Sequence, residues 1–131
     1  MPGCVLRAAG VDFDVDKFAE SSSFSPCEVY RKGEPKGSRG KLREKSGLNV
    51  VVSEASGDDL RQQIDDALKF LEKNKTEIES LLSYAEESSL DFGVWQRCEF
   101  ARYYRFPPEL LRLAGSLGLS VELSVYVGAD N

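Results

Sequence analysis

The residues that most often carry catalysis are scarce in this chain of 131 residues. Histidine is absent, which removes the commonest general base and the commonest metal ligand. The three cysteines, Cys4, Cys27 and Cys98, stand far apart, and no two of them form a C-x-x-C pair. A Ser-His-Asp or Cys-His centre is therefore excluded within the chain, and we predict no zinc site, no other metal site and no cofactor.

Adjacent carboxylates are the remaining candidates for acid–base chemistry. They occur as Asp58-Asp59, Asp65-Asp66 and Glu86-Glu87. Each pair falls on an expected helix cap or solvent-facing surface, whereas a catalytic base needs an apolar pocket. We therefore expect no catalytic residue and no enzyme activity. A small hydrolase or transferase that works from carboxylates alone is the alternative.

One segment of the chain is strongly basic. Segment 31–45 holds seven lysines and arginines against two glutamates, a net charge of +5, and the rest sums to −10 because the whole chain carries −5. The basic residues are Arg31, Lys32, Lys36, Arg39, Lys41, Arg43 and Lys45. The glycines and the proline of segment 31–45 favour a flexible, solvated loop rather than a helix or strand. The alternative is an arm that contacts phosphate or nucleic acid, and without interleaved aromatic residues such binding should be weak and non-specific.

Aromatic and arginine residues near the C-terminal half form the best candidate for a binding surface. In an expected strand over 91–99, Trp95 and Arg97 share the row that points away from the apolar row. Tyr126 is expected on a neighbouring strand, and Tyr103 and Tyr104 follow closely. Tryptophan, tyrosine and arginine are the residue types enriched at interaction hot spots. The alternative is that the chain's own loops cover Trp95.

The longest predicted helical region, Asp58–Ser88, has one apolar stripe with charged residues on the opposite face. The stripe is interrupted at 72–75, which contains no apolar residue. This favours two helices with a bend near Asn74, and a single kinked helix is the alternative. Thr76 and Glu79 have the spacing of a capping box at the start of the second helix.

Strands and shorter helices surround this region. Apolar or alternating runs predict strands at Cys4–Ala9, within Ser46–Glu54, at 90–100 and at 119–126. Asp14 is an expected N-cap of a short helix that ends near Glu20, and Phe106-Pro107-Pro108 opens a last helix that ends at Gly118. The pattern predicts an α+β two-layer sandwich, in which a mainly antiparallel sheet of about four strands is covered on one face by helices.

Two motifs, and the position of the helical pair in Asp58–Ser88, resemble those of a known bacterial family. The run from Ser25 through Tyr30 to Pro35 is similar to the proline, aromatic and (R/K)-x-G-(D/E)-P pattern of the family called domain of unknown function 4279. The helix from Phe106 to Gly118, with the strand after it, resembles the last helix and strand of that family. The basic residues after Gly33 depart from the family pattern. The resemblance supports the fold, implies no chemistry, and suggests an immunity-like or other partner-binding role because similar proteins are found near toxin systems.

The chain as a whole predicts a single domain over 1–131. No apolar run approaches the roughly 18 residues of a membrane span, and the first residues do not resemble a signal peptide. Widely spaced, reduced cysteines favour a cytoplasmic location. We therefore expect a small bacterial cytoplasmic protein that binds another protein without catalysis. The acidic remainder of the chain favours a basic partner, and a homodimer is kept as a further alternative.

Overall fold

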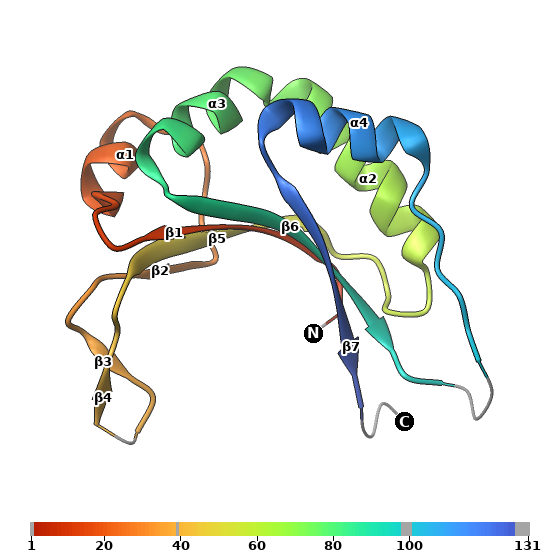
Figure 1. The fold of residues 1–131 in the computed structure, drawn as a ribbon, viewed down its shortest axis with the longest axis horizontal. Helices are drawn as coiled ribbons and strands as arrows, with labels where there is room; N and C mark the ends of the chain where they lie inside the picture. Colours follow the sequence, from red (N-terminus) through yellow and green to blue (C-terminus); the bar gives the residue numbers. More distant parts are fainter. Residues whose placement is uncertain (1, 39, 98–100, 128–131) are drawn as a thin grey trace.

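The computed structural model describes residues 2–38, 40–97 and 101–127, which form four helices and seven strands (Figure 1). In chain order they are β1 (Cys4–Gly10), α1 (Val15–Ser21), β2 (Glu28–Tyr30), β3 (Pro35–Lys36), β4 (Lys41–Leu42), β5 (Ser46–Ser53), α2 (Leu60–Lys73), α3 (Lys75–Tyr84), β6 (Glu87–Trp95), α4 (Pro108–Leu117) and β7 (Ser120–Tyr126). The predicted α+β class is confirmed.

The main sheet has five strands rather than about four, and it is mixed, since three of its four strand pairings are antiparallel, in line with the predicted mainly antiparallel sheet, and one is parallel. Its order is β2-β5-β1-β6-β7. β1 is antiparallel to both of its neighbours, whereas β7 runs parallel to β6. The parallel pair was not predicted, although the helix that connects β6 to β7 was. A crossover helix brings the chain back to the end of the sheet where β6 began, which makes the next strand parallel.

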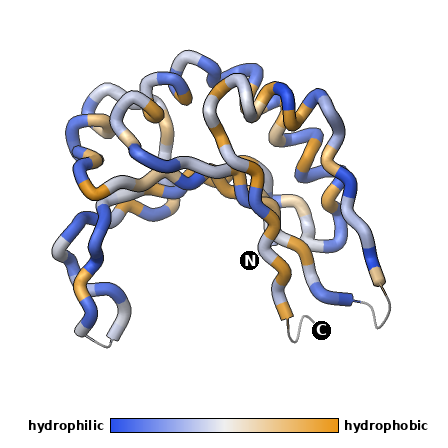
Figure 2. The backbone as a smooth tube through the Cα atoms, in the orientation of Figure 1, coloured by the Kyte–Doolittle hydropathy of each residue, from blue (hydrophilic) through white to orange (hydrophobic). Residues whose placement is uncertain are grey.

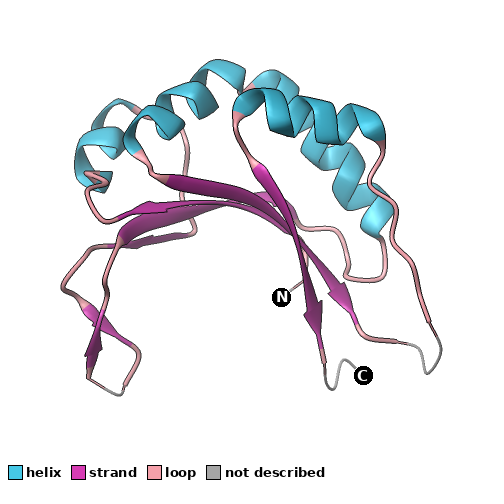
Figure 3. Cartoon of the chain, viewed as in Figure 1, coloured by secondary structure: helices cyan, strands magenta, loops and turns pink. Residues whose placement is uncertain are grey.

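All four helices lie on the convex face of the curved sheet, as Figure 3 shows. The core fills the space between the two layers, and Figure 2 shows hydrophobic segments of the helices turned toward the strands. The fully buried side chains there come from every layer: Leu6, Leu48, Leu90 and Phe92 from the sheet, and Phe18, Leu71, Ile78, Leu81 and Leu110 from the helices. The predicted two-layer arrangement with one covered face is confirmed, and the concave face is left without a helix.

The predicted bend at Asn74 is confirmed, because α2 ends at Lys73 and α3 begins at Lys75. The predicted capping box is wrong. Thr76 already lies inside the first turn of α3, and the N-cap is Asn74, which makes no side-chain capping bond there. Its amide instead donates to the Phe70 carbonyl oxygen at 2.9 Å and closes the end of α2. Two helices joined by one residue leave no extended position for a threonine cap.

Four other helix ends follow the sequence. Asp14 and Asp59 each accept a hydrogen bond from the backbone N–H three residues later, at 3.1 Å. Pro108 stands in the first turn of α4, and Gly118 ends that helix in the left-handed region with φ of 87°. A residue with a Cβ is strained at that φ, so a glycine there fixes where the helix stops.

Two segments differ from their predicted boundaries. β6 begins at Glu87, earlier than expected, because Glu87 and Ser88 pair with β1. Their polar side chains gave no apolar signal for a strand. β6 ends at Trp95, and residues 98–100 of the predicted strand, including Cys98, lie outside the described residues. Segment 31–45 contains a short hairpin, β3–β4, where only a loop was predicted.

Candidate functional site

Trp95, Arg97 and Tyr126 lie together where β6 and β7 end, as their strand positions require. Trp95 and Tyr126 are paired in register, and their rings meet edge to face with centroids 6.1 Å apart. The Arg97 guanidinium carbon lies 5.7 Å from the centroid of the Trp95 ring, a cation–π distance. Trp95 and Tyr126 are both half-buried. We call these three residues the Trp95 cluster.

The start of α2 forms the support of this cluster. The backbone N–H of Trp95 donates to the Gly57 carbonyl oxygen at 3.2 Å, and a Cβ at Gly57 would lie only 2.8 Å from the Cδ1 atom of the Trp95 indole. Glycine at this position therefore allows the indole to pack on the chain just before the helix. Arg97 donates two hydrogen bonds to the Asp58 carboxylate, at 2.7 and 2.6 Å. These bonds hold the pKa of Asp58 below its ordinary value.

Gln63 fixes α2 against β6. Its side chain is fully buried, and its amide nitrogen donates to the carbonyl oxygens of Gly93 and Ser56 at 2.8 and 3.0 Å. The Gly93 N–H donates to the amide oxygen of Gln63 at 3.3 Å. A buried amide that is satisfied on both sides binds a helix to a strand in one register. Gln63 therefore determines where Asp58 and the first turn of α2 stand.

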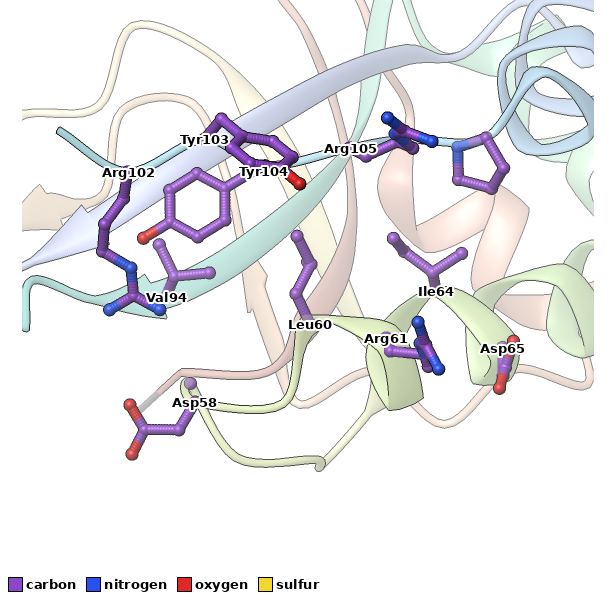
Figure 4. A pocket seen from close by; sticks show the side chains of 12 residues that line it. Asp58, Leu60, Arg61, Ile64, Asp65, Val94, Arg102, Tyr103, Tyr104 and Arg105 are labelled. Atoms are coloured by element: carbon purple, nitrogen blue, oxygen red, sulfur yellow. The ribbon is translucent and has the colours of Figure 1, made fainter.

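A pocket of about 470 Å³ opens on the other side of Asp58, between the first turns of α2 and the segment 101–107 (Figure 4). Its apolar surface comes from Leu60, Ile64, Val94 and Pro107. Leu60 and Ile64 point from α2 toward the segment that carries Tyr103 and Tyr104, whereas Asp58 and Asp65 point away from it. Tyr103 is 83% exposed, and Tyr104 is half-buried. We call this site the arginine–tyrosine pocket.

Three arginines line this pocket: Arg61, Arg102 and Arg105. Within the described part of the chain, none of the three takes part in an ion pair. Arg102 stacks on Tyr104 with its guanidinium carbon 5.6 Å from the ring centroid. The lining acids are Asp58, which Arg97 already binds, and Asp65. The pocket thus has excess positive charge in a protein of net charge −5, which suits an anionic group.

The concave sheet face forms a second hollow of about 460 Å³, and several polar side chains that line it, such as Arg7, Glu28 and Asn49, already form hydrogen bonds. Asp91 is buried and accepts hydrogen bonds from Arg7 and from the hydroxyl of Ser124, the latter at 2.8 Å. Glu28 accepts a hydrogen bond from the amide of Asn49 at 2.7 Å. A ligand here would have to replace existing bonds, so this face offers less binding energy than the arginine–tyrosine pocket.

The basic segment is divided between paired and unpaired cations. Arg31 binds Asp16, Lys45 binds Glu87, and Arg43 binds Glu28 and lies over the Tyr30 ring. Lys32, Lys36 and Lys41 form no ion pair with any described residue, and Arg39 lies outside the described residues. These ion pairs neutralise part of the positive charge that binding of nucleic acid by segment 31–45 would require.

Neither of the two described cysteines, Cys4 and Cys27, contributes to either site. Cys4 is fully buried in β1, and burial raises the pKa of its thiol well above the ordinary value. Cys27 is an exposed free thiol. Among the described residues no group of three or more histidine, cysteine or acidic side chains is placed to hold a metal ion. No described helix combines the length and the apolar character needed to cross a membrane.

Comparison with known families supports the resemblance noted in the sequence. Residues 3–128 match the family described as Domain of unknown function (DUF4279). The chain belongs to this family. The match covers the sheet, all four helices and both candidate sites. Searches of curated proteins and of solved structures found no match, so the DUF4279 assignment brings a fold-wide relationship but no activity or ligand.

The five residues that the sequence predicted as a binding surface all lie at this end of the molecule, together with others that were not predicted. Trp95, Arg97 and Tyr126 form one cluster, while Tyr103 and Tyr104 line the pocket on the other side of Asp58. The missed residues are Asp58, Arg61, Gln63, Arg102 and Arg105. The run Arg102-Tyr103-Tyr104-Arg105 was a usable signal, because it puts two tyrosines between two arginines. The helical spacing was a usable signal for Gln63 as well, because it stands three residues after Leu60 and four before Ala67, on the apolar stripe of α2.

Proposed function

We propose that this DUF4279 protein is a non-catalytic protein-binding module, and that the arginine–tyrosine pocket is its recognition site. The observation that carries the proposal is the three arginines without ion pairs around an apolar surface. Pockets that combine an apolar lining with a few convergent polar groups are the usual form of a binding site. Arginine and tyrosine are also the residues that most often dominate interaction energies.

The charge of the pocket, rather than the acidic charge of the chain as a whole, indicates the chemistry of the partner, so we propose an acidic segment where the sequence favoured a basic partner. An acidic side chain entering the pocket would form charge-assisted hydrogen bonds with guanidinium groups that form no ion pair with any described residue. The apolar surface made by Leu60, Ile64 and Val94 would take a neighbouring apolar or aromatic side chain. The proposed ligand is therefore a segment of a partner protein in which an acidic residue lies beside an apolar one.

The Trp95 cluster extends this recognition surface. Asp58 lines the pocket and also binds Arg97, so a partner that fills the pocket can reach the half-buried rings of Trp95 and Tyr126. An immunity-like protein, which covers the active surface of a toxin, is one specific form of this proposal. The exposed free thiol of Cys27 supports placing the module in the cytoplasm.

The experiment is a selection of binding peptides from a random phage-displayed library. The wild-type protein should enrich sequences with an acidic residue next to an apolar or aromatic one. The pocket variant Arg61→Ala/Arg105→Ala should fail to enrich them. The control is Lys69→Ala/Lys73→Ala, which removes the same charge from exposed positions of α2 outside the pocket.

Two results would contradict the proposal. The first is that wild-type protein enriches no motif. The second is that both double variants lose enrichment equally, which would show that total charge rather than the pocket attracts the peptides. Retained melting temperature in both variants is the check that they are folded.

A further inference from the structure

The two edges of the five-stranded sheet differ in their protection against pairing with another chain. β2 forms one edge with three residues, and β7 forms the other with seven. β7 has a single charged residue, Glu122, and no proline. Shortness, charge and proline are the usual means by which proteins protect an edge strand. β7 lacks the first and third of these and has little of the second, so it is an open edge.

A row of exposed apolar side chains accompanies this edge. Leu123, Val125 and Val127 are 36%, 50% and 76% exposed. Leu123 and Val125 are in register with Phe92 and Val94 of β6, which are buried beneath the helices. They therefore lie on the helix side of the sheet, and Figure 1 shows β7 running away from α4. The helix layer ends before the apolar row does.

The backbone of β7 also offers unpaired groups on its outer side. The Tyr126 carbonyl oxygen accepts a hydrogen bond from the Gln96 N–H at 2.8 Å, so the backbone of Tyr126 faces β6. Backbone groups of successive strand residues point to alternate sides. Those of Val121, Leu123 and Val125 therefore face outward, and no other described strand pairs with them.

We propose that β7 is a dimerisation strand, which pairs antiparallel with β7 of a second copy about a two-fold axis at Leu123. This register places Val121 opposite Val125 of the second copy and joins the two apolar rows. The three outward-facing residues of each strand would form about six hydrogen bonds between the copies. The two five-stranded sheets would become one continuous sheet.

A second copy suits this edge because the strand is complementary to itself. With the axis at Leu123, Glu122 lies opposite Ser124 of the second copy, and the only charge on the strand meets no like charge. An axis at Glu122 would oppose two glutamates, which is unfavourable. An isologous contact of this kind closes with two copies and leaves no further open edge at β7. This inference goes beyond the proposed function and does not depend on the arginine–tyrosine pocket.

Sedimentation velocity over a range of protein concentrations tests the proposal. Wild-type protein should form a dimer, and Val125→Lys should be monomeric with an unchanged fold by circular dichroism. The control is Val51→Lys, the same substitution at a valine of β5 that is 41% exposed, and it should still dimerise. A wild-type protein that stays monomeric at about 100 µM, far above the roughly micromolar range of specific association, would overturn the proposal. Equal loss of dimer in both variants would also overturn it.

Cysteine cross-linking tests the register without requiring a lysine variant to fold. In a background of Cys27→Ser and Cys98→Ser, Leu123→Cys should form an intermolecular disulfide on mild oxidation. Residues directly opposite in a hydrogen-bonded antiparallel pair have Cα atoms about 5.5 Å apart, within disulfide range. Ser124 lies opposite Glu122 of the second copy rather than opposite Ser124, so Ser124→Cys should not cross-link. Equal cross-linking at both positions, or none at Leu123→Cys, would overturn the proposed pairing.

Discussion

Replacing Gln63 by leucine should destabilise the protein by about 2–4 kcal/mol, although the residue lies at no surface. Leucine fills a similar volume but cannot donate to the Gly93 and Ser56 carbonyl oxygens or accept from the Gly93 N–H. The substitution therefore removes polar contacts at the junction of α2 and β6 while keeping the apolar packing. It tests whether this buried amide positions the start of α2.

The magnitude follows from which backbone groups keep another partner. The Gly93 N–H still donates to the Gly3 carbonyl oxygen at 2.8 Å, and the Ser56 carbonyl oxygen still accepts from the Asp59 N–H at 2.9 Å. The Gly93 carbonyl oxygen loses its hydrogen bond from Gln63, and a buried polar group left unsatisfied costs about 1–3 kcal/mol. The weakened bonds add about 1 kcal/mol. For a domain of this size the change corresponds to a fall in melting temperature on the order of 10 °C.

Urea denaturation followed by circular dichroism measures the effect as a lower midpoint at an unchanged slope. The control is Gln62→Leu on the same helix, since Gln62 is exposed and its amide reaches only Asp66. That variant should change stability by less than about 0.5 kcal/mol. If Gln63→Leu were no more destabilising than Gln62→Leu, the amide would not hold α2 to β6.

Three further outcomes are expected. Trp95→Ala should lower the free energy of unfolding by about 1.5–2.5 kcal/mol, roughly half the loss for a fully buried aromatic, because the ring is half-buried between Gly57 and Tyr126. Thermal melting measures this loss, and an unchanged melting curve would mean that the ring has no packing role. Hydrogen bonds lower the pKa values of Asp16, Asp58 and Asp66, so the stability that these carboxylates contribute is present above about pH 4 and is lost as the pH falls further. Asp58→Asn should therefore flatten the acid side of a plot of melting temperature against pH, and an unchanged acid side would refute this. Limited trypsin digestion should cut first within 31–45, because the short β3–β4 hairpin and its neighbours hold seven basic residues; mass spectrometry of the first fragments would show whether the core helices are cut as early.

The helices and most strands could be predicted because their side chains face one apolar core. The apolar stripe in Asp58–Ser88 predicted α2 and α3, and the absence of apolar residues at 72–75 predicted the bend at Asn74. The direction of β7 could not be read in this way, since side-chain alternation is the same in parallel and antiparallel strands. The first residues of β6 were missed because Glu87 and Ser88 are polar and gave no apolar signal. The β3–β4 hairpin has too few residues for any periodic signal.

The candidate site was only partly predictable, because its two walls are far apart in the chain. Arg61 lies on α2, and Arg105 follows β6, so only the packing of the two segments brings them to one pocket. Sequence alternation did place Trp95 and Arg97 on one row, and the register of β6 with β7 adds Tyr126 to it. The spacing of Gln63 puts it on the apolar stripe of α2, but the backbone groups that its amide binds could not be predicted from the sequence.

The most direct test of the proposed function is the affinity of a peptide chosen by the library selection for three proteins. Fluorescence anisotropy would compare wild-type protein, Arg61→Ala/Arg105→Ala and Lys69→Ala/Lys73→Ala. Loss of charge-assisted hydrogen bonds worth about 1.5–3 kcal/mol should weaken binding to the pocket variant about tenfold or more. The control variant should bind within about threefold of wild type, as expected for exposed charges outside the contact. Equal affinities of all three proteins would contradict the assignment of recognition to the arginine–tyrosine pocket.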